Sequence, residues 1–299
     1  MASSTELWSL ISDSLHAVTD CGLITDYKSL AGGSINRAYR INTEAGVSYF
    51  VKLNSAAGLP MFEAECDGLY ELISANAIRV PLPVTTGSGA GSAWLVSEYI
   101  QLGRGQSGSQ RLLGLQLAAM HRASEGCFGW YRDNTIGSTP QHNNQGENWI
   151  DFYRECRLLY QLDLAARNGF TGSLQKKGER LLTDLNHFFS GYSPQPSLLH
   201  GDLWGGNCAF DEGGQPVIFD PAVYYGDREA DLAMTELFGG FASEFYDAYN
   251  DAWPIDGGYR IRKELYNLYH ILNHANLFGG GYVAQAESMI DSLLAEIRG

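Results

Sequence analysis

The stretch that decides the fold is LHGDLWGGN (residues 199–207), and the sequence that follows it predicts a β-hairpin over residues 207–220. The turn of this hairpin is DEGG, between two β-rich segments. Because hairpin strands pair antiparallel, Asn207 at one end and Asp220 at the other are expected side by side. Their oxygens suit Mg²⁺, which also binds water and phosphate oxygens. Asp202, just upstream, is placed to accept a proton from an attacking hydroxyl.

The spacing within this stretch matches a known phosphoryl-transfer loop. Asp202 and Asn207 have the five-residue separation of the kinase catalytic loop H-R-D-x-x-x-x-N. The alternative is that H-G-D forms a plain turn and that Asp220 only caps a strand. Three spaced polar residues around one hairpin are more specific than any single motif, so we favour the catalytic interpretation.

An N-terminal lysine and a glutamate on the next helix complete the expected nucleotide site. Lys52 lies on a predicted strand, and Glu65 lies on the predicted helix 61–76 that follows. An ion pair between them would hold the ammonium against the α- and β-phosphates of ATP. We favour Glu65 because leucines follow it at core spacing, with Glu63 as an open alternative.

Two backbone segments are further candidates for nucleotide contact. Gly32, Gly33 and Ser34 precede a predicted strand, where backbone N–H groups could approach phosphate; a plain turn is the alternative, since the pattern is not G-x-G-x-x-G. Glu98 and Ile100 follow an apolar strand, and we expect their backbone to be the hinge that pairs with adenine.

The fold class expected from these patterns is α+β, with two lobes. The small lobe, residues 1–102, combines an antiparallel sheet with a helix, and a glycine- and serine-rich linker follows at 103–110. The larger lobe, residues 111–299, is mostly helical and carries the catalytic loop and the acceptor site. Periodicity predicts helices over 7–21, 61–76, 111–124, 149–168, 174–189, 231–238, 259–275 and 282–297. Strands are predicted over 39–41, 48–53, 93–96, 207–210 and 217–220.

Composition excludes several classes of protein. The 299 residues carry 20 Lys+Arg against 34 Asp+Glu, a formal charge of −14, so nucleic-acid binding and membrane-surface binding are not expected. No apolar run approaches the roughly 18 residues of a membrane span, and the start MASSTELWSL does not resemble a signal peptide. The five cysteines form no C-x-x-C pair, so neither a disulfide framework nor a zinc site is expected. We therefore expect a soluble, cytoplasmic protein.

The chain resembles a known family along nearly its whole length. The stretch 199–207 together with IFDPA (218–222), YYGDREADLAM (224–234), MFEAE (61–65) and DNTIGSTPQ (133–141) closely resembles the fructosamine kinase, or ketosamine 3-kinase, family. That family is related to aminoglycoside phosphotransferases and choline kinases. The resemblance implies a bilobal protein-kinase-like fold. It also implies transfer of phosphate from ATP, with Mg²⁺, to the 3-hydroxyl of a free or protein-bound ketosamine, in a deglycation role.

The resemblance also implies roles for the site residues. Asp202 would be the catalytic base, Asn207 and Asp220 the magnesium ligands, and Lys52 with Glu65 the phosphate clamp. Asp-Pro-Ala stands where protein kinases have Asp-Phe-Gly, and no A-P-E segment follows, which argues against a kinase that phosphorylates proteins on their own side chains.

The sequence signals for the acceptor-binding residues are less specific than those for the catalytic loop. Trp204 is the favoured aromatic of the acceptor site, with a core role as the alternative. Asp227 and Glu229 would provide a negative environment for the acceptor amine, or would only brace the loop after Pro221. Asp231 either caps a helix or reaches the backbone of the catalytic loop.

Two other functions remain open at this stage. An aminoglycoside- or choline-type phosphotransferase would share the same catalytic residues and differ only in its acceptor pocket. A catalytically dead nucleotide-binding module would normally have lost one of the four main polar residues, and all four are present.

Overall fold

The computed structural model describes residues 4–31 and 35–298, so Gly32, Gly33 and Ser34 lie outside the described residues. The chain forms two compact units. One contains Met1–Ser109 and Ala209–Pro221, and the other contains Gln110–Cys208 and Ala222–Gly299.

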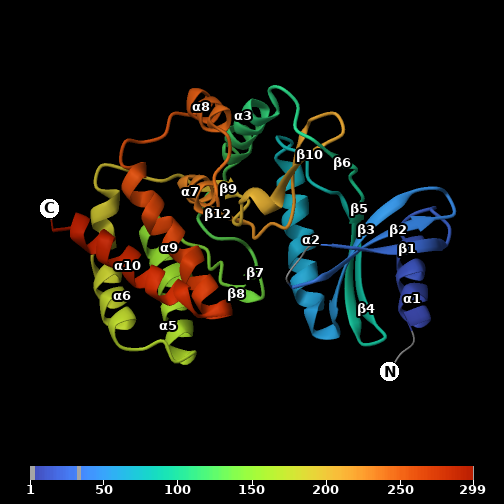
Figure 1. Ribbon diagram of the computed structural model, residues 1–299, viewed down its shortest axis with the longest axis horizontal. Helices are drawn as coiled ribbons and strands as arrows, with labels where there is room; N and C mark the ends of the chain where they lie inside the picture. The colour runs from blue at the N-terminus through green and yellow to red at the C-terminus, as the bar shows by residue number, and fades with distance from the viewer. Residues whose placement is uncertain (1–3, 32–34, 299) are drawn as a thin grey trace. The chain divides into compact units, whose positions relative to one another are not determined.

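A five-stranded antiparallel sheet in the order β1-β2-β3-β5-β4 forms the centre of the first unit (Figure 1). Its strands are β1 (Ile24–Leu30), β2 (Arg37–Thr43), β3 (Ser48–Ser55), β4 (Pro83–Gly89) and β5 (Ser92–Glu98). The predicted strands 39–41 and 48–53 are confirmed as parts of β2 and β3, which pair antiparallel. Two strands carry no clear signal in the sequence: β1, an edge strand with little buried surface, and β4, which contains proline and glycine.

Two helices cover the faces of this sheet: α1 (Ser4–His16), and α2 (Leu59–Ser74), which follows the short helix η1 (Ala56–Gly58). Val51 and Leu53 of β3 join the buried cluster that α1 completes. Because side chains alternate along a strand, Lys52 between them points to the opposite face, where α2 packs. The period of the strand thus brings the lysine to the helix that carries Glu65.

A three-stranded sheet in the order β11-β10-β6 contains the hairpin predicted over residues 207–220. Its strands are β6 (Leu102–Gly103), β10 (Cys208–Asp211) and β11 (Pro216–Ile218). In the turn, one carboxylate oxygen of Asp211 accepts the N–H groups of Gly213 and Gln215, each at 2.9 Å. Arg79 binds Asp211 at 2.7 Å, so the hairpin groups with the first unit, although its position in the sequence falls within 111–299.

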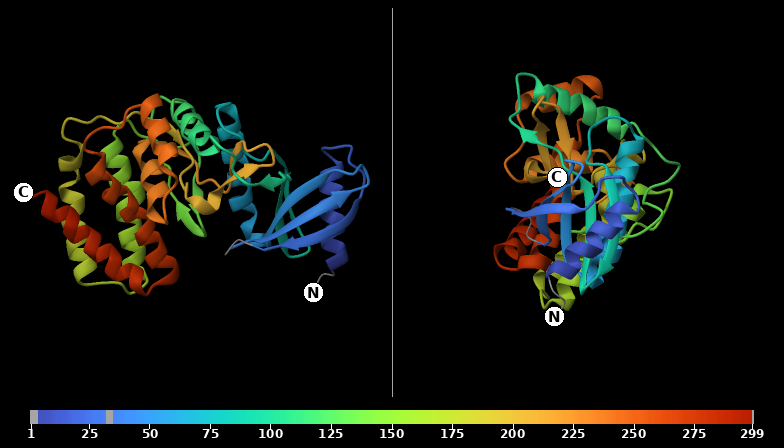
Figure 2. Two further views of the ribbon diagram at one scale, coloured as in Figure 1. Left: turned by 45° about the horizontal axis from the view of Figure 1, so that its top comes forward. Right: turned by 90° about the vertical axis from the view of Figure 1, so that its right-hand side faces the viewer.

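The second unit is mostly helical, and its helices α5, α6, α9 and α10 pack together (Figure 2). Its helical segments are α3 (Ser109–His121), α4 (Trp149–Tyr153), η2 (Arg154–Leu159), α5 (Tyr160–Arg167), α6 (Ser173–Thr183), η3 (Leu185–Phe189), η4 (Gly205–Asn207), α7 (Glu229–Leu237), α8 (Ser243–Ala252), α9 (Tyr259–Phe278) and α10 (Gly281–Glu296). Two-stranded sheets pair β7 (Asn134–Ile136) with β8 (Thr139–Gln141) and β9 (Ser197–Leu199) with β12 (Tyr224–Gly226).

The predicted helices of this unit are present, with differences in detail. The predicted helix 149–168 contains the π-helical turn η2, which accommodates the fully buried Arg157. The helix α8 is not predicted, because its aspartates and asparagine have low helix propensity. Among the described residues, no helix is long and apolar enough to cross a membrane.

Candidate active site

The backbone of the catalytic loop is held by Asp231, a buried residue of α7. One carboxylate oxygen of Asp231 accepts the N–H of Gly201 at 2.8 Å, and the other accepts the N–H of His200 at 2.7 Å. Of the two roles expected for Asp231, the structure shows the contact with the loop backbone. The carbonyl of His200 also accepts the N–H of Ala222 at 2.8 Å, which joins the loop to the segment after the hairpin.

A buried histidine completes the support of Asp231. Nε2 of His121 lies 3.1 Å from Oδ2 of Asp231, and Nδ1 of the same ring lies 2.8 Å from the hydroxyl of Tyr249. Burial alone would raise the pKa of Asp231, but the bond and charge of His121 and the loop N–H groups outweigh it and hold the pKa below its usual value. Asp231 is therefore an ionised anchor of the loop.

Asp202 and Asn207 meet within the loop, as the spacing predicts. The amide nitrogen of Asn207 donates to the backbone carbonyl of Asp202 at 2.9 Å and to its Oδ2 at 3.1 Å. Because Nδ2 is used in these bonds, Oδ1 of Asn207 is the atom left for a metal ion. The same bonds fix the position of the carboxylate that would act as base.

In the first unit, Lys52 forms ion pairs with two carboxylates. Its ammonium contacts Glu65 of α2 and lies 2.6 Å from Oδ1 of Asp220, while Glu63 is exposed. Burial disfavours the ammonium, but the charges of Asp220 and Glu65 more than offset it, so the pKa of Lys52 is raised above its usual value. Burial also raises the pKa of Glu65, against the opposing charge of Lys52.

Asp220 adopts a backbone conformation that is uncommon for a residue with a side chain. Its φ is +58°, in the left-handed region. Such strain tends to persist where function requires a particular direction of a side chain. The side chain of Asp220 is 46% exposed, so the carboxylate that contacts Lys52 also remains open to a ligand.

The expected magnesium ligands, Asn207 and Asp220, each carry an oxygen of the kind that Mg²⁺ binds. No group of three or more His, Cys, Asp or Glu side chains within residues 4–31 and 35–298 is arranged to hold a metal by itself. Asn207 belongs to the second unit and Asp220 to the first, and the hairpin that links them is formed by β10 and β11. Two protein oxygens with phosphate and water are the usual environment of Mg²⁺.

The two hinge candidates lie at the end of β5. The N–H of Glu98 already donates to the carbonyl of Leu82 at 2.8 Å, and its carboxylate pairs with Arg79 at 2.7 Å. Ile100 is half-buried two residues beyond the strand. The N–H of Glu98 is therefore already used, and adenine would have to pair with other backbone groups of this segment.

Trp204 is a surface residue, so the alternative of a core role does not hold. Its side chain is 38% exposed, and its ring meets that of Phe238 edge to face, with centroids 6.0 Å apart. A Cβ on Gly206 would lie 2.3 Å from the indole, so the glycine leaves room for the ring. The indole belongs to the catalytic loop, two residues after Asp202 in the sequence.

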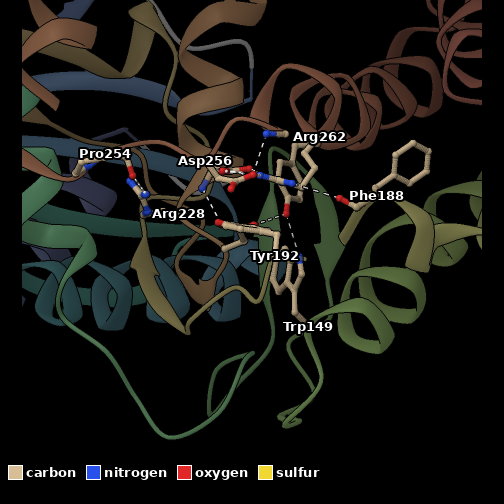
Figure 3. Close-up of polar contacts among 11 residues, drawn as sticks. Trp149, Phe188, Tyr192, Arg228, Pro254, Asp256 and Arg262 are labelled. Carbon is tan, nitrogen blue, oxygen red and sulfur yellow. Dashed lines mark hydrogen bonds and ion pairs between the residues drawn. The ribbon is translucent and has the colours of Figure 1, made fainter. Parts of the chain in front are cut away.

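The structure corrects the expectation that Asp227 and Glu229 face the acceptor. Figure 3 shows Tyr192 and Arg262, two of the residues whose side chains bind these carboxylates. Both carboxylates are buried, and both are bound by side chains of the protein. The hydroxyls of Tyr192 and Tyr266 donate to Asp227 at 2.9 and 2.5 Å. Arg262 binds Glu229 with two nitrogens, at 2.7 and 3.0 Å. These carboxylates therefore brace the loop after Pro221, which is the structural alternative.

Burial also changes the acidity of these two groups. It raises the pKa of Asp227, although the tyrosine hydroxyls oppose the shift. It raises the pKa of Glu229 to about 7, against the opposing guanidinium of Arg262. Both shifts arise because a charge in this interior has lost its water.

An amide network that was not predicted from the sequence holds the segment after Asp220. Asn134 donates to the carbonyl of Val223 at 2.8 Å, and Gln141 donates to that of Ala222 at 3.0 Å. Gln141 also binds Asn134 at 2.8 Å. The signal was the polar pattern of DNTIGSTPQ, whose amides lie on β7 and β8 and point inward.

Comparison with known proteins gives a consistent family assignment. The family model described as fructosamine kinase matches residues 7–296. A protein named "Probable ketoamine kinase" from Synechocystis sp. is 48% identical over 272 residues, 91% of each chain. The protein-ribulosamine 3-kinase, chloroplastic, of Arabidopsis thaliana is 46% identical over 279 residues, 92% of this chain and 84% of that one.

Solved structures share the fold. One from Haemophilus somnus 129PT, provisionally named a fructosamine-3-kinase, has a TM-score of 0.87 and 29% identity, covering 96% of this chain and 99% of that one. An aminoglycoside phosphotransferase solved with ADP and hygromycin B has a TM-score of 0.62 at 16% identity, over 96% and 99% of the two chains. The α+β, protein-kinase-like fold predicted from the sequence is therefore confirmed.

Proposed function

Because this chain belongs to the fructosamine kinase family, we propose that it is an ATP-dependent kinase that phosphorylates the 3-hydroxyl of ketosamines. The observation that carries the proposal is the catalytic loop. Asp202 and Asn207 are bonded to each other there, and Asp231 anchors the loop backbone. The names of the relatives, ketoamine kinase and protein-ribulosamine 3-kinase, support the acceptor class.

The proposed mechanism assigns one task to each polar side chain. Asp202 accepts the proton of the acceptor hydroxyl as its oxygen attacks the γ-phosphorus of ATP, and ADP leaves with the electrons of the broken bond. Asn207 and Asp220 would hold Mg²⁺, which neutralises charge on the phosphates. Lys52, held by Glu65, would bind the α- and β-phosphates.

The acceptor combines a basic amine with a hydroxyl-bearing carbon chain. Since Asp227 and Glu229 are buried, the proposed contact for the ammonium is the exposed face of Trp204, through a cation–π interaction. Phosphate at the 3-position is poised for elimination, which would free the glycated amine. We therefore propose a deglycation role, with five-carbon ribulosamines as the preferred acceptors, as the name of the plant relative suggests.

The test is a phosphorus NMR assay with ATP and Mg²⁺ on four acceptors: a ribulosamine, a fructosamine, choline and kanamycin. We expect a sugar phosphate signal from the first two and little from the others. Phosphorylation of choline or kanamycin, with neither ketosamine touched, would overturn the acceptor class and leave the kinase activity standing.

The base is tested by Asp202→Asn, which keeps the shape of the side chain and removes its basicity. We expect kcat to fall by about a thousandfold or more, in line with loss of a general base and of its positioning, while ATP still binds. The control is Asp163→Asn, which removes the same charge from an exposed position on α5. Near-normal turnover by Asp202→Asn at saturating substrates would contradict the assignment.

A further inference from the structure

A row of aromatic side chains continues from Trp204 across the surface of the second unit. After Trp204 and Phe238, the next ring is His274, whose centroid lies 5.1 Å from that of Phe238. Phe278 and Tyr282 then lie 5.6 and 5.1 Å from His274. We call these five residues the aromatic strip.

Several rings of the aromatic strip are exposed to solvent, although aromatic side chains are usually buried. Phe238 is 37% exposed and Phe278 is 61% exposed, which is unusual for phenylalanine. Nδ1–H of His274 donates to the carbonyl of His270 at 2.8 Å, so the central ring is fixed. The strip joins three helices, because Phe238 follows α7, Phe278 ends α9 and Tyr282 lies in the first turn of α10.

Glycines flank each exposed ring of the strip. The sequence reads WGG at 204–206, FGG at 238–240 and FGGG at 278–281. A Cβ added at Gly205, Gly239, Gly280 or Gly281 would meet no atom within 4 Å. Glycine at such places lets another backbone come close to the surface. The rings thus protrude beside bare main chain, as suits an extended chain laid across them.

We propose that the aromatic strip binds the polypeptide that carries the ketosamine. This inference rests on the proposed function, which puts the acceptor hydroxyl at Asp202. Phe278 lies three ring contacts beyond Trp204, with centroid steps of 6.0, 5.1 and 5.6 Å, so a small acceptor held at Asp202 would not extend to it. A glycated lysine within a peptide extends further, since its methylenes and the flanking residues continue away from the amine. A glycated polypeptide suits the strip because Trp204, its first residue, belongs to the catalytic loop.

The kind of contact follows from the side chains present. Aromatic rings offer large apolar area with little conformational entropy to lose, and they accept varied side chains of a peptide. No charged residue belongs to the strip, so recognition would depend on shape and apolar contact and not on one peptide sequence. Such a surface suits many different glycated proteins.

The test compares two acceptors that share one ketosamine: ribulosyl-lysine as the free amino acid, and a blocked peptide with one ribulosyl-lysine at its centre. The variant is Phe278→Ser, and the control is Val18→Ser, which removes a side chain of similar exposure, 58% against 61%, on the first unit. For Phe278→Ser we expect KM for the peptide to rise about five- to tenfold at unchanged kcat, and KM for the free amino acid to stay within about twofold. Tyr282→Ser should act in the same direction.

The outcomes separate this inference from the proposed function. If the wild-type enzyme phosphorylates neither ketosamine, the proposed function fails and the inference fails with it. If it phosphorylates both, but Phe278→Ser changes the two KM values equally or not at all, only the inference is overturned. Light scattering gives a third result: a wild-type dimer that Phe278→Ser converts to a monomer would mean that a second copy covers the strip, which also overturns the inference.

Discussion

A single glycine explains why the catalytic loop reads H-G-D where the kinase motif has H-R-D. Gly201 has a φ of +81°, and a Cβ there would lie 2.0 Å from the carbonyl oxygen of Ala222. The close approach follows from the N–H of Ala222 bonding to the carbonyl of His200. An arginine cannot occupy this position while the loop and the segment after the hairpin remain in contact.

We therefore predict that Gly201→Ala destabilises the protein and slows catalysis. The free energy of unfolding should fall by at least about 2 kcal/mol, because strain and a backbone clash act together. Gly126→Ala is the matched control: a Cβ there meets no atom within 4 Å, so we expect a change within about 0.5 kcal/mol. Urea unfolding of the two variants checks the prediction. Equal stability of the two variants would contradict it, because the loop would then have moved to accommodate the Cβ.

At the scale of elements, α9 carries two adjacent cations in different environments. Arg262 is 2% exposed and binds the buried Glu229. Lys263 pairs with Glu236 at 2.6 Å on the surface, where both side chains are about one-third exposed. A buried charge that loses its partner keeps the cost of lost hydration, whereas an exposed one regains water.

This contrast predicts unequal effects of neighbouring substitutions. Arg262→Met should lower the free energy of unfolding by about 3–5 kcal/mol, since Glu229 is left buried and unpaired. Lys263→Met should cost at most about 1 kcal/mol. Thermal unfolding near neutral pH measures both, and a loss for Arg262→Met no greater than that for Lys263→Met would contradict the network shown in Figure 3.

The same scale shows which elements could be predicted from sequence. Long amphipathic helices such as α9 were predictable because burial imposes the 3.6-residue period on their side chains. The strand β1 carries no such period, since little of its surface is buried. The strand β7 is buried but has only three residues, which is too short for a period to show. The Lys52–Glu65 pair was predictable because strand alternation and helix spacing both select it.

Other parts of the site could not be predicted, for physical reasons. Asp227 lies in an acidic, functional-looking motif, but whether a carboxylate faces solvent or the interior depends on partners such as Tyr192 and Tyr266, which are remote in sequence. For the same reason the bond between His121 and Asp231 links residues 110 positions apart, and no local pattern indicates it.

At the scale of the whole molecule, the proposed nucleotide contacts are divided between two units. Lys52, Glu65 and Asp220 belong to the first, whereas Asp202 and Asn207 belong to the second. A ligand that binds only the folded chain stabilises it by an amount that grows with the logarithm of its concentration relative to its Kd. Nucleotide binding should therefore be visible as a change in the unfolding temperature of the entire protein.

We predict that ATP with Mg²⁺ at about 100 times its Kd stabilises the wild-type protein by about 2.7 kcal/mol. EDTA should remove most of this shift, because phosphate then lacks its metal. Lys52→Met should lose the shift as well, whereas Lys28→Met, which removes an exposed cation of β1, should retain it. Differential scanning fluorimetry with and without nucleotide makes the measurement, and a full shift in Lys52→Met would refute the phosphate clamp.

The β10–β11 hairpin has a consequence for inheritance. Residues 209–221 leave the stretch that forms the second unit, complete the sheet with β6, and return, so the chain changes unit at residues 109, 208 and 221. A gene fragment that stops at residue 109 encodes Lys52 and Glu65 without Asp220. Because neither unit is one continuous stretch of coding sequence, a single recombination event cannot exchange, duplicate or delete one of them intact. A single crossover between residues 109 and 209 would thus separate Lys52 and Glu65 from Asp220.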